Sequence, residues 1–180
     1  MAATKAKAQL GLDVVLFVVA ADPWQKRGTR PLSPAEVRME MVEALIASHE
    51  GLEASGMEIA RGGPSYSVDT ARRLCEEARA AGEDLELYLI VGADLAGQLE
   101  TWHEPEELAA LVTVAIVERD GEPEVPLHPR WRSVKVTGGT IDASSTMLRS
   151  ALAEGLAVDA LTDPGVIRIV EAHDLYHWAR

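Results

Sequence analysis

Three runs of apolar residues predict strands that are buried on both faces. They cover residues 14–20, 85–91 and 112–117 and are rich in Val, Leu and Ile. A strand with one wet face usually alternates apolar and polar residues, whereas runs that stay mostly apolar favour a sheet covered by helices on both sides. Two more strands are expected at residues 57–60 and 131–137.

Helix patterns separate these runs. Residues 2–10 are good helix formers that end at Gly11. Ser33 is expected to cap the next helix, with Pro34 at its first position and Glu36 three residues after the cap. Further helices are expected at residues 69–80, 104–111, 144–153 and 164–172. Alternating strands and helices predict an α/β fold with a parallel sheet, and the lack of a linker predicts one domain over residues 1–180.

Composition narrows the classes of partner. The formal net charge is −12, with 17 Lys and Arg against 29 Asp and Glu, so a nucleic-acid backbone is not an expected partner. The single cysteine, Cys75, allows no internal disulfide and suits a reducing compartment. The apolar run at residues 14–21 is too short to span a bilayer. We therefore expect a cytoplasmic chain without a membrane partner, and the sequence leaves a homo-oligomer open.

Hydroxyl residues followed by an arginine open the helix expected at residues 144–153. Free amides and the positive end of the helix dipole at such a start bind anions. Arg149 lies one turn beyond Ser145 and Thr146, where its guanidinium can add a planar fork to phosphate oxygens. The residues alone leave a second interpretation equally open, a capped helix with a solvated arginine.

Ligands of parallel sheets bind beyond the carboxyl ends of the strands, which selects residues 22–30, 92–102 and 137–146. Trp102 is there a candidate platform for a flat heterocycle, with core packing as the alternative. Core packing is the interpretation we favour for Trp131 and Trp178. Lys26 is a phosphate ligand or a solvated cation. From the residues alone, Asp69 is expected to cap the helix that it opens.

Taken together, these segments resemble nicotinate mononucleotide adenylyltransferases of the nucleotidyltransferase superfamily. Residues 142–149, Asp-Ala-Ser-Ser-Thr-Met-Leu-Arg, are similar to the Ile-Ser-Ser-Thr-x-x-Arg motif, with Ala143 where the family commonly has Ile. Residues 64–70 resemble Pro-Ser-Tyr-Thr-x-Asp-Thr, and residues 92–94 with Trp102 resemble Gly-Ala-Asp…Trp. Residues 22–26 correspond to a Pro-x-x-Lys loop. The motifs occur in the family's order up to Tyr176.

The resemblance implies a Rossmann-like domain that transfers the adenylyl group of ATP to nicotinate mononucleotide, with Mg²⁺, giving deamido-NAD and pyrophosphate. The alternatives are a non-catalytic nucleotide-binding protein and an adenylyltransferase for another small phosphate such as phosphopantetheine. The resemblance implies that ATP is bound by Lys26, Gly92, Asp94, Ser144, Ser145, Thr146 and Arg149. For nicotinate mononucleotide it implies Ser65, Tyr66, Ser67, Asp69 and Trp102.

The family's first strand, with Gly-Gly-Thr-Phe-Asp-Pro and the catalytic His-x-Gly-His, has no match in the sequence. We therefore expect no catalytic histidine and little turnover, and a sheet without the family's first strand. Either the start lies upstream of Met1, or the other strands close the gap, or a partner supplies a strand. His103, beside Trp102, is the first candidate to replace the histidines. His173 and His177 share a helix spacing without a third ligand, so no metal site is expected.

Overall fold

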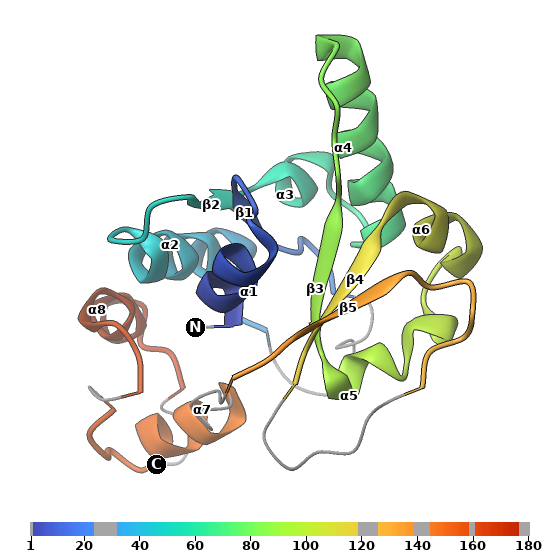
Figure 1. Ribbon diagram of the computed structural model, residues 1–180. Helices are drawn as coiled ribbons and strands as arrows, with labels where there is room; N and C mark the ends of the chain where they lie inside the picture. Colours follow the sequence, from blue (N-terminus) through green and yellow to red (C-terminus); the bar gives the residue numbers. More distant parts are fainter. Residues whose placement is uncertain (1, 24–31, 119–125, 139–144, 159–160, 177–180) are drawn as a thin grey trace. The chain divides into compact units, whose positions relative to one another are not determined.

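The chain folds into two compact units, each made of two separate chain segments. One unit comprises residues 1–13 and 64–140, and the other comprises residues 14–63 and 141–180. The computed structural model describes residues 2–23, 32–118, 126–138, 145–158 and 161–176 (Figure 1). The α/β class with parallel sheets is confirmed, and the single domain over residues 1–180 stays a prediction.

The first unit is built on a parallel three-stranded sheet in the order β3-β4-β5. Strand β4 is central, with Val91 of β3 opposite Ile116 and Val136 of β5 opposite Val117. Gly82 ends α4 in a left-handed conformation with φ 73°, which a glycine adopts without strain. The strands are β3 (Tyr88–Gly92), β4 (Thr113–Val117) and β5 (Ser133–Val136), and the helices are α1 (Ala2–Leu10), α4 (Ser67–Ala81), α5 (Ala93–Ala96), η2 (Leu99–Thr101) and α6 (Pro105–Leu111).

Side chains from both faces of this sheet are buried in separate clusters. Val114 and Ile116 of β4 pack on one face with residues of α4 and α6. Ala115 and Val117, the alternate residues of the same strand, pack on the other face with Ala6 of α1. Burial on both faces confirms what the continuous apolar run at residues 112–117 predicted.

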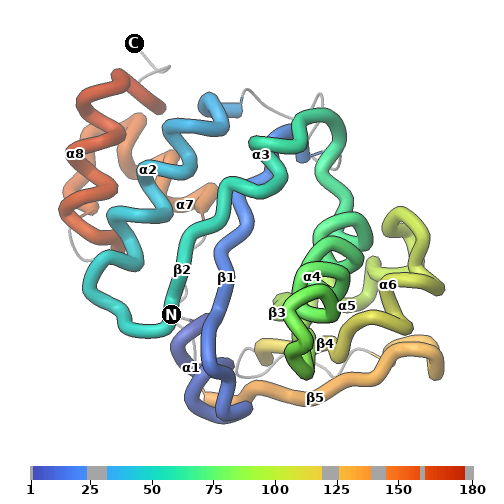
Figure 2. The backbone as a smooth tube through the Cα atoms, turned by 90° about the horizontal axis from the view of Figure 1, so that it is seen from above, coloured from blue at the N-terminus to red at the C-terminus, as the bar shows by residue number. Residues whose placement is uncertain are grey.

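The second unit contains a two-stranded parallel sheet, in which Val15 of β1 lies opposite Leu52 of β2. Helix α2 packs against both β2 and α8, and Figure 2 shows α2 and α8 side by side. The elements are β1 (Val15–Val18), α2 (Ala35–Ile46), β2 (Leu52–Ser55), α3 (Met57–Arg61), α7 (Ser145–Ala153) and α8 (Pro164–Ala172).

The strand predicted at residues 57–60 is wrong, because Met57–Arg61 is the helix α3. The apolar-polar alternation of this segment imitated a strand, yet Glu58 is buried at 7% exposure. The strand of this region lies just before it, at Leu52–Ser55. Its parallel pairing with β1 comes from residues distant in sequence, which no local pattern reports.

Two other details differ from the prediction. Pro34, not Ser33, is the N-cap of α2, and no side chain caps that helix. The Ser33 hydroxyl lies 3.1 Å from the Tyr176 hydroxyl. Its partner is therefore a residue distant in sequence and not a backbone amide of the helix. The three expected apolar strands also fall into two sheets, with β1 in one and both β3 and β4 in the other.

Truncating Leu108 tests the core of the first unit. The side chain is 1% exposed, so Leu108→Ala should lower the free energy of unfolding by about 2–5 kcal/mol. The matched control is Leu85→Ala, because Leu85 is 43% exposed in the same unit and should lose about 0.5 kcal/mol or less. Urea denaturation measures both, and equal losses would contradict the assigned core.

Candidate active site

The carboxyl end of β3 runs directly into a short helix that carries an aspartate. Gly92 is the N-cap of α5, and Asp94 lies in the helix's first turn. A Cβ atom on Gly92 would lie 2.6 Å from the Asp94 Oδ1 atom, so any larger residue would displace the carboxylate. Glycine at residue 92 therefore leaves room for the Asp94 side chain in this position.

Two segments distant in sequence meet at the amino end of α4. Tyr66 is the N-cap of α4, and its ring stacks on that of His103 with centroids 4.0 Å apart and planes 25° apart. Tyr66 also packs against the buried cluster of the unit. The stack brings together the motif at residues 64–70 and the residue that follows Trp102. His103 was not among the predicted ligand residues, and its only sequence signal was its place beside Trp102.

Trp102 packs against the core but is not fully buried. The residue ends η2 and is half-buried against the cluster under α4 and α6. Its indole Nε1 is buried, and in the described part of the chain it has no hydrogen-bond partner. Trp131 is different, since it is 6% exposed and its Nε1 donates to Glu100 Oε1 at 2.6 Å. The core role predicted for Trp131 is confirmed, while a ligand role of Trp102 stays a prediction.

The other predicted residues of this segment lie at the start of α4. Ser65 precedes Tyr66, and Ser67 is the first residue of the helix. Asp69 lies in its first turn and accepts a hydrogen bond from the Arg72 guanidinium at 2.9 Å. Tyr66, not Asp69, is the N-cap of α4, and the ligand role of Asp69 stays a prediction.

The hydroxyl and arginine motif begins α7 in the second unit. Ser145 and Thr146 are exposed in the first turn. Arg149 is half-buried, and its Nη2 donates to Thr146 Oγ1 at 3.3 Å. This contact confirms that Arg149 and the Thr146 hydroxyl lie on one face of the helix.

Tyr176 holds the Arg149 side chain from a second direction. The Arg149 guanidinium carbon lies 6.0 Å from the centre of the Tyr176 ring, a cation–π distance. Ser33 binds the hydroxyl of Tyr176, and Arg38 donates to the Ser33 carbonyl at 3.1 Å. Burial lowers the pKa of Arg38. Sequence reasoning missed Arg38, because a lone arginine in a helix carries no signal of these contacts.

A cavity of about 170 Å³ lies beside this arginine in the second unit. Ser145, Arg149, Thr162 and Tyr176 provide its polar lining. Apolar side chains from α2, α7 and α8 form the remaining wall. The motif residues thus border a hollow that combines one positive charge with an apolar interior.

Two predicted ATP ligands, Lys26 and Ser144, lie outside the described residues. Within the described residues, no group of three or more His, Cys, Asp or Glu side chains is arranged to hold a metal. His173 ends α8 with its Nε2 3.4 Å from Glu40 Oε2, and His177 is not described. In the same residues no helix is long and apolar enough to cross a membrane.

The parallel sheets and the motif order agree with comparisons to known proteins. The family described as cytidylyltransferase-like matches residues 1–151. A Streptomyces coelicolor protein named "Probable nicotinate-nucleotide adenylyltransferase" is 36% identical over 98% of this chain and 92% of its own length. A Thermus thermophilus protein of the same name is 39% identical over 98% of this chain and 90% of its own.

Solved structures give the same fold. The Plasmodium falciparum nicotinic acid mononucleotide adenylyltransferase complexed with APC matches 99% of this chain and 89% of its own, with a TM-score of 0.74 and 14% identity. The same enzyme complexed with NaAD matches 93% of this chain and 84% of its own, with a TM-score of 0.68 and 14% identity. These likenesses show a fold of the cytidylyltransferase-like class. Within that class, the chain belongs to the nicotinate-nucleotide adenylyltransferase family.

Arg149→Ala tests the phosphate role of α7. We expect ATP to bind about tenfold or more weakly, because a charge-assisted hydrogen bond contributes about 1.5–3 kcal/mol. Binding of nicotinate mononucleotide should fall less. Titration calorimetry measures both ligands, with Arg168→Ala as control because Arg168 is an exposed arginine of α8 in the same unit. Equal losses for both ligands would remove Arg149 from the phosphate site.

Proposed function

We propose that this chain transfers the adenylyl group of ATP to nicotinate mononucleotide, forming deamido-NAD and pyrophosphate in NAD biosynthesis. The observation that carries the proposal is the meeting of two motifs at the amino end of α4. Tyr66 from one motif stacks at 4.0 Å on His103, which directly follows Trp102 of the other, and both Tyr66 and Trp102 pack against the same cluster. Family membership supports the same acceptor.

The substrate phosphate would attack the α-phosphorus of ATP in line. A new phosphorus–oxygen bond forms there while the bond to the β-phosphate oxygen breaks, and pyrophosphate leaves with the electron pair. Because such a transfer depends mainly on positioning and charge stabilisation, cations and donors are the residues it requires. Arg149, Thr146 and Ser145 are proposed to hold phosphates, with Lys26 and Ser144 as further ligands.

The remaining residues are assigned to the two nucleosides. Gly92 and Asp94 are proposed to approach the ribose of ATP, consistent with the close fit of the Asp94 carboxylate against Gly92. Trp102 is proposed to stack on the pyridine ring. Ser65, Tyr66, Ser67 and Asp69 are proposed to frame that ring and its carboxylate.

Magnesium is implied by the family resemblance and belongs to the proposal only as the companion of the ATP phosphates. Mg²⁺ is commonly bound through substrate phosphates together with one or two carboxylates. The described residues offer no cluster of three or more ligands of their own. No step of the proposed reaction is therefore assigned to an ion held by the protein.

Trp102→Ala tests the pyridine platform. Losing a stacked ring should weaken nicotinate mononucleotide by about 0.5–1.5 kcal/mol beyond the loss of buried area, with ATP affinity much less affected. Tryptophan fluorescence and calorimetry measure the two affinities. Trp102→Phe is the control, because it keeps a flat ring and removes an indole N–H that has no partner in the described chain. Unchanged affinity in a folded Trp102→Ala protein would leave Trp102 with core packing alone.

A turnover assay tests the proposed reaction. No segment of the 180-residue sequence matches the family's His-x-Gly-His. We therefore expect the protein to bind ATP and nicotinate mononucleotide but to turn them over well below about 1 s⁻¹. Pyrophosphate release and chromatography of deamido-NAD measure it.

Three outcomes of this assay would change the proposal. Turnover at about 1 s⁻¹ or faster would mean that another residue replaces the histidines, with His103 as the first to substitute. Adenylylation of phosphopantetheine but not of nicotinate mononucleotide would contradict the proposed acceptor. Binding of both nucleotides without any product would favour a non-catalytic protein.

A further inference from the structure

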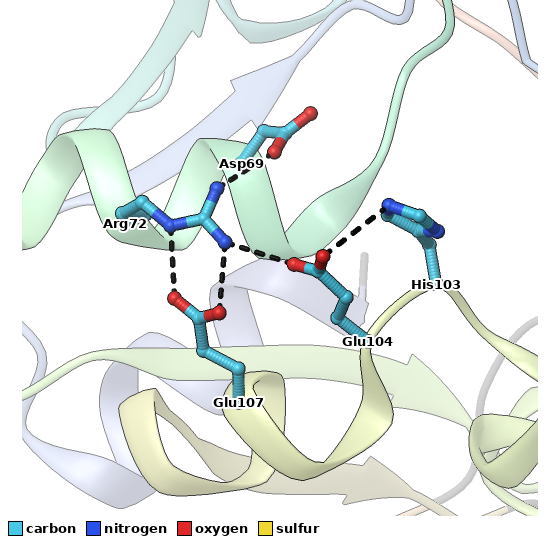
Figure 3. A network of polar contacts seen from close by, with 5 residues as sticks. All are labelled: Asp69, Arg72, His103, Glu104 and Glu107. Carbon is cyan, nitrogen blue, oxygen red and sulfur yellow. Dashed lines mark hydrogen bonds and ion pairs between the residues drawn. The ribbon is translucent and has the colours of Figure 1, made fainter.

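One arginine ties the starts of two helices together beside the Tyr66–His103 stack. The Arg72 guanidinium donates to Asp69 at 2.9 Å, to Glu104 at 2.9 Å and to both oxygens of Glu107 at 2.8 Å (Figure 3). Asp69 and Arg72 belong to α4, whereas Glu104 and Glu107 belong to the start of α6. The arginine is the cation that joins these three carboxylates.

The geometry of this cluster differs from that of an ordinary surface ion pair. Isolated exposed pairs contribute little, but a two-pronged arginine contact within a network fixes both distance and direction. The contact with Glu107 has this form, with Nε and Nη2 each bound to one carboxylate oxygen. Hydrogen bonding to Arg72 lowers the pKa of Glu107, so this carboxylate stays ionised to a lower pH than an unpaired glutamate.

The backbone conformation of Glu104 is a second indication that the segment before α6 is held in place. Its backbone is left-handed, with φ 48° and ψ 58°, at the N-cap of α6. Residues other than glycine rarely adopt this conformation, so surrounding contacts must maintain it. Its side chain accepts a hydrogen bond from Arg72 and also lies 3.8 Å from His103 Nε2.

We propose that Arg72 is a positioning residue for the pyridine site, because it holds the turn at residues 102–104 against the amino end of α4. The identity of the ligand rests on the proposed function, whereas the positioning role of Arg72 rests on the contacts described above. Arg72 fixes Glu104, the backbone of Glu104 fixes His103, and His103 is then in place to stack on Tyr66. Without Arg72 the carboxylates would repel one another, and the turn would leave this position.

Arg72→Met tests this role by two measurements. The first is the proton NMR signal of the His103 ring, which the stacked Tyr66 ring shifts upfield. We expect this shift to be largely lost in the variant. The second is ligand affinity by calorimetry, where the Kd of nicotinate mononucleotide should rise about tenfold while that of ATP changes less than twofold. Arg72→Lys keeps the charge but not the fork, and should fall between the two proteins.

Arg73→Met is the matched control, because Arg73 is the next residue of α4 and pairs with Glu77 at 2.7 Å on the exposed surface. It should change neither measurement. Should Arg72→Met fail to fold, Glu104→Ala carries the same test, since it removes only one of the three carboxylates and should shift both measurements in the same direction.

Several results would overturn the proposal. A His103 signal unchanged in Arg72→Met would do so, as would an equal loss of affinity for both ligands, which indicates general destabilisation. A displaced His103 ring with unchanged affinity for nicotinate mononucleotide would also overturn it. If the unaltered protein binds no nicotinate mononucleotide, the proposed function fails instead, and the His103 signal alone then decides whether Arg72 positions this turn.

Discussion

Burial of β4 on both faces is the constraint on which the first unit depends. Val114 and Ala115 are each 0% exposed although they point to opposite sides of the sheet. Such a strand requires a layer of helices on either side, and α4 with α6 supplies one while α1 supplies the other. Packing against β4 holds the helices of each layer in place, and with them the helix ends. The amino end of α4, which carries most of the proposed pyridine residues, is therefore positioned by packing on an apolar strand.

The candidate ligand residues divide between the two units along the lines of their chemistry. Residues that match the pyridine motifs all lie in the first unit, together with Gly92 and Asp94. The described residues of the phosphate motif lie in the second unit, where Tyr176 and Thr146 orient Arg149. Aromatic stacking dominates the first set, whereas charge and hydroxyl groups dominate the second. This division suits the proposed reaction, which has to bind both a flat heterocycle and the phosphates of ATP.

The sequence predicted elements well where the signal was local. Helix α1 and helix α8 occupy their expected residues, because the capping residues, helix breakers and apolar periodicity that define them lie within or next to each segment. A strand was predicted at residues 57–60, where helix α3 lies, and β2 was missed, since β2 is defined by pairing with β1. The Ser33 cap failed for a related reason, as a tyrosine 143 residues away binds its hydroxyl. Local patterns cannot report a partner that only the fold supplies.

The candidate site shows the same limit. The Arg149 contact to Thr146 follows from helical spacing and could be read directly. The Arg72 cluster could not, because its partners Glu104 and Glu107 lie 32 and 35 residues away. A charged residue in an amphipathic helix has the same local pattern whether it is solvated or joins a network. Only the packing of α4 against α6 distinguishes the two cases.

The left-handed backbone of Glu104 has a consequence for how this chain can change over many generations. Glycine at residue 104 would relieve the backbone, but it would also delete the acceptor for Arg72. The two demands oppose each other, so the tolerated residues at position 104 depend on the residue at position 72. Glycine or asparagine at residue 104 costs less once the arginine is gone, because no hydrogen-bond acceptor is then lost. Drift at the two positions is therefore coupled, and the order in which substitutions arise decides which of them survive.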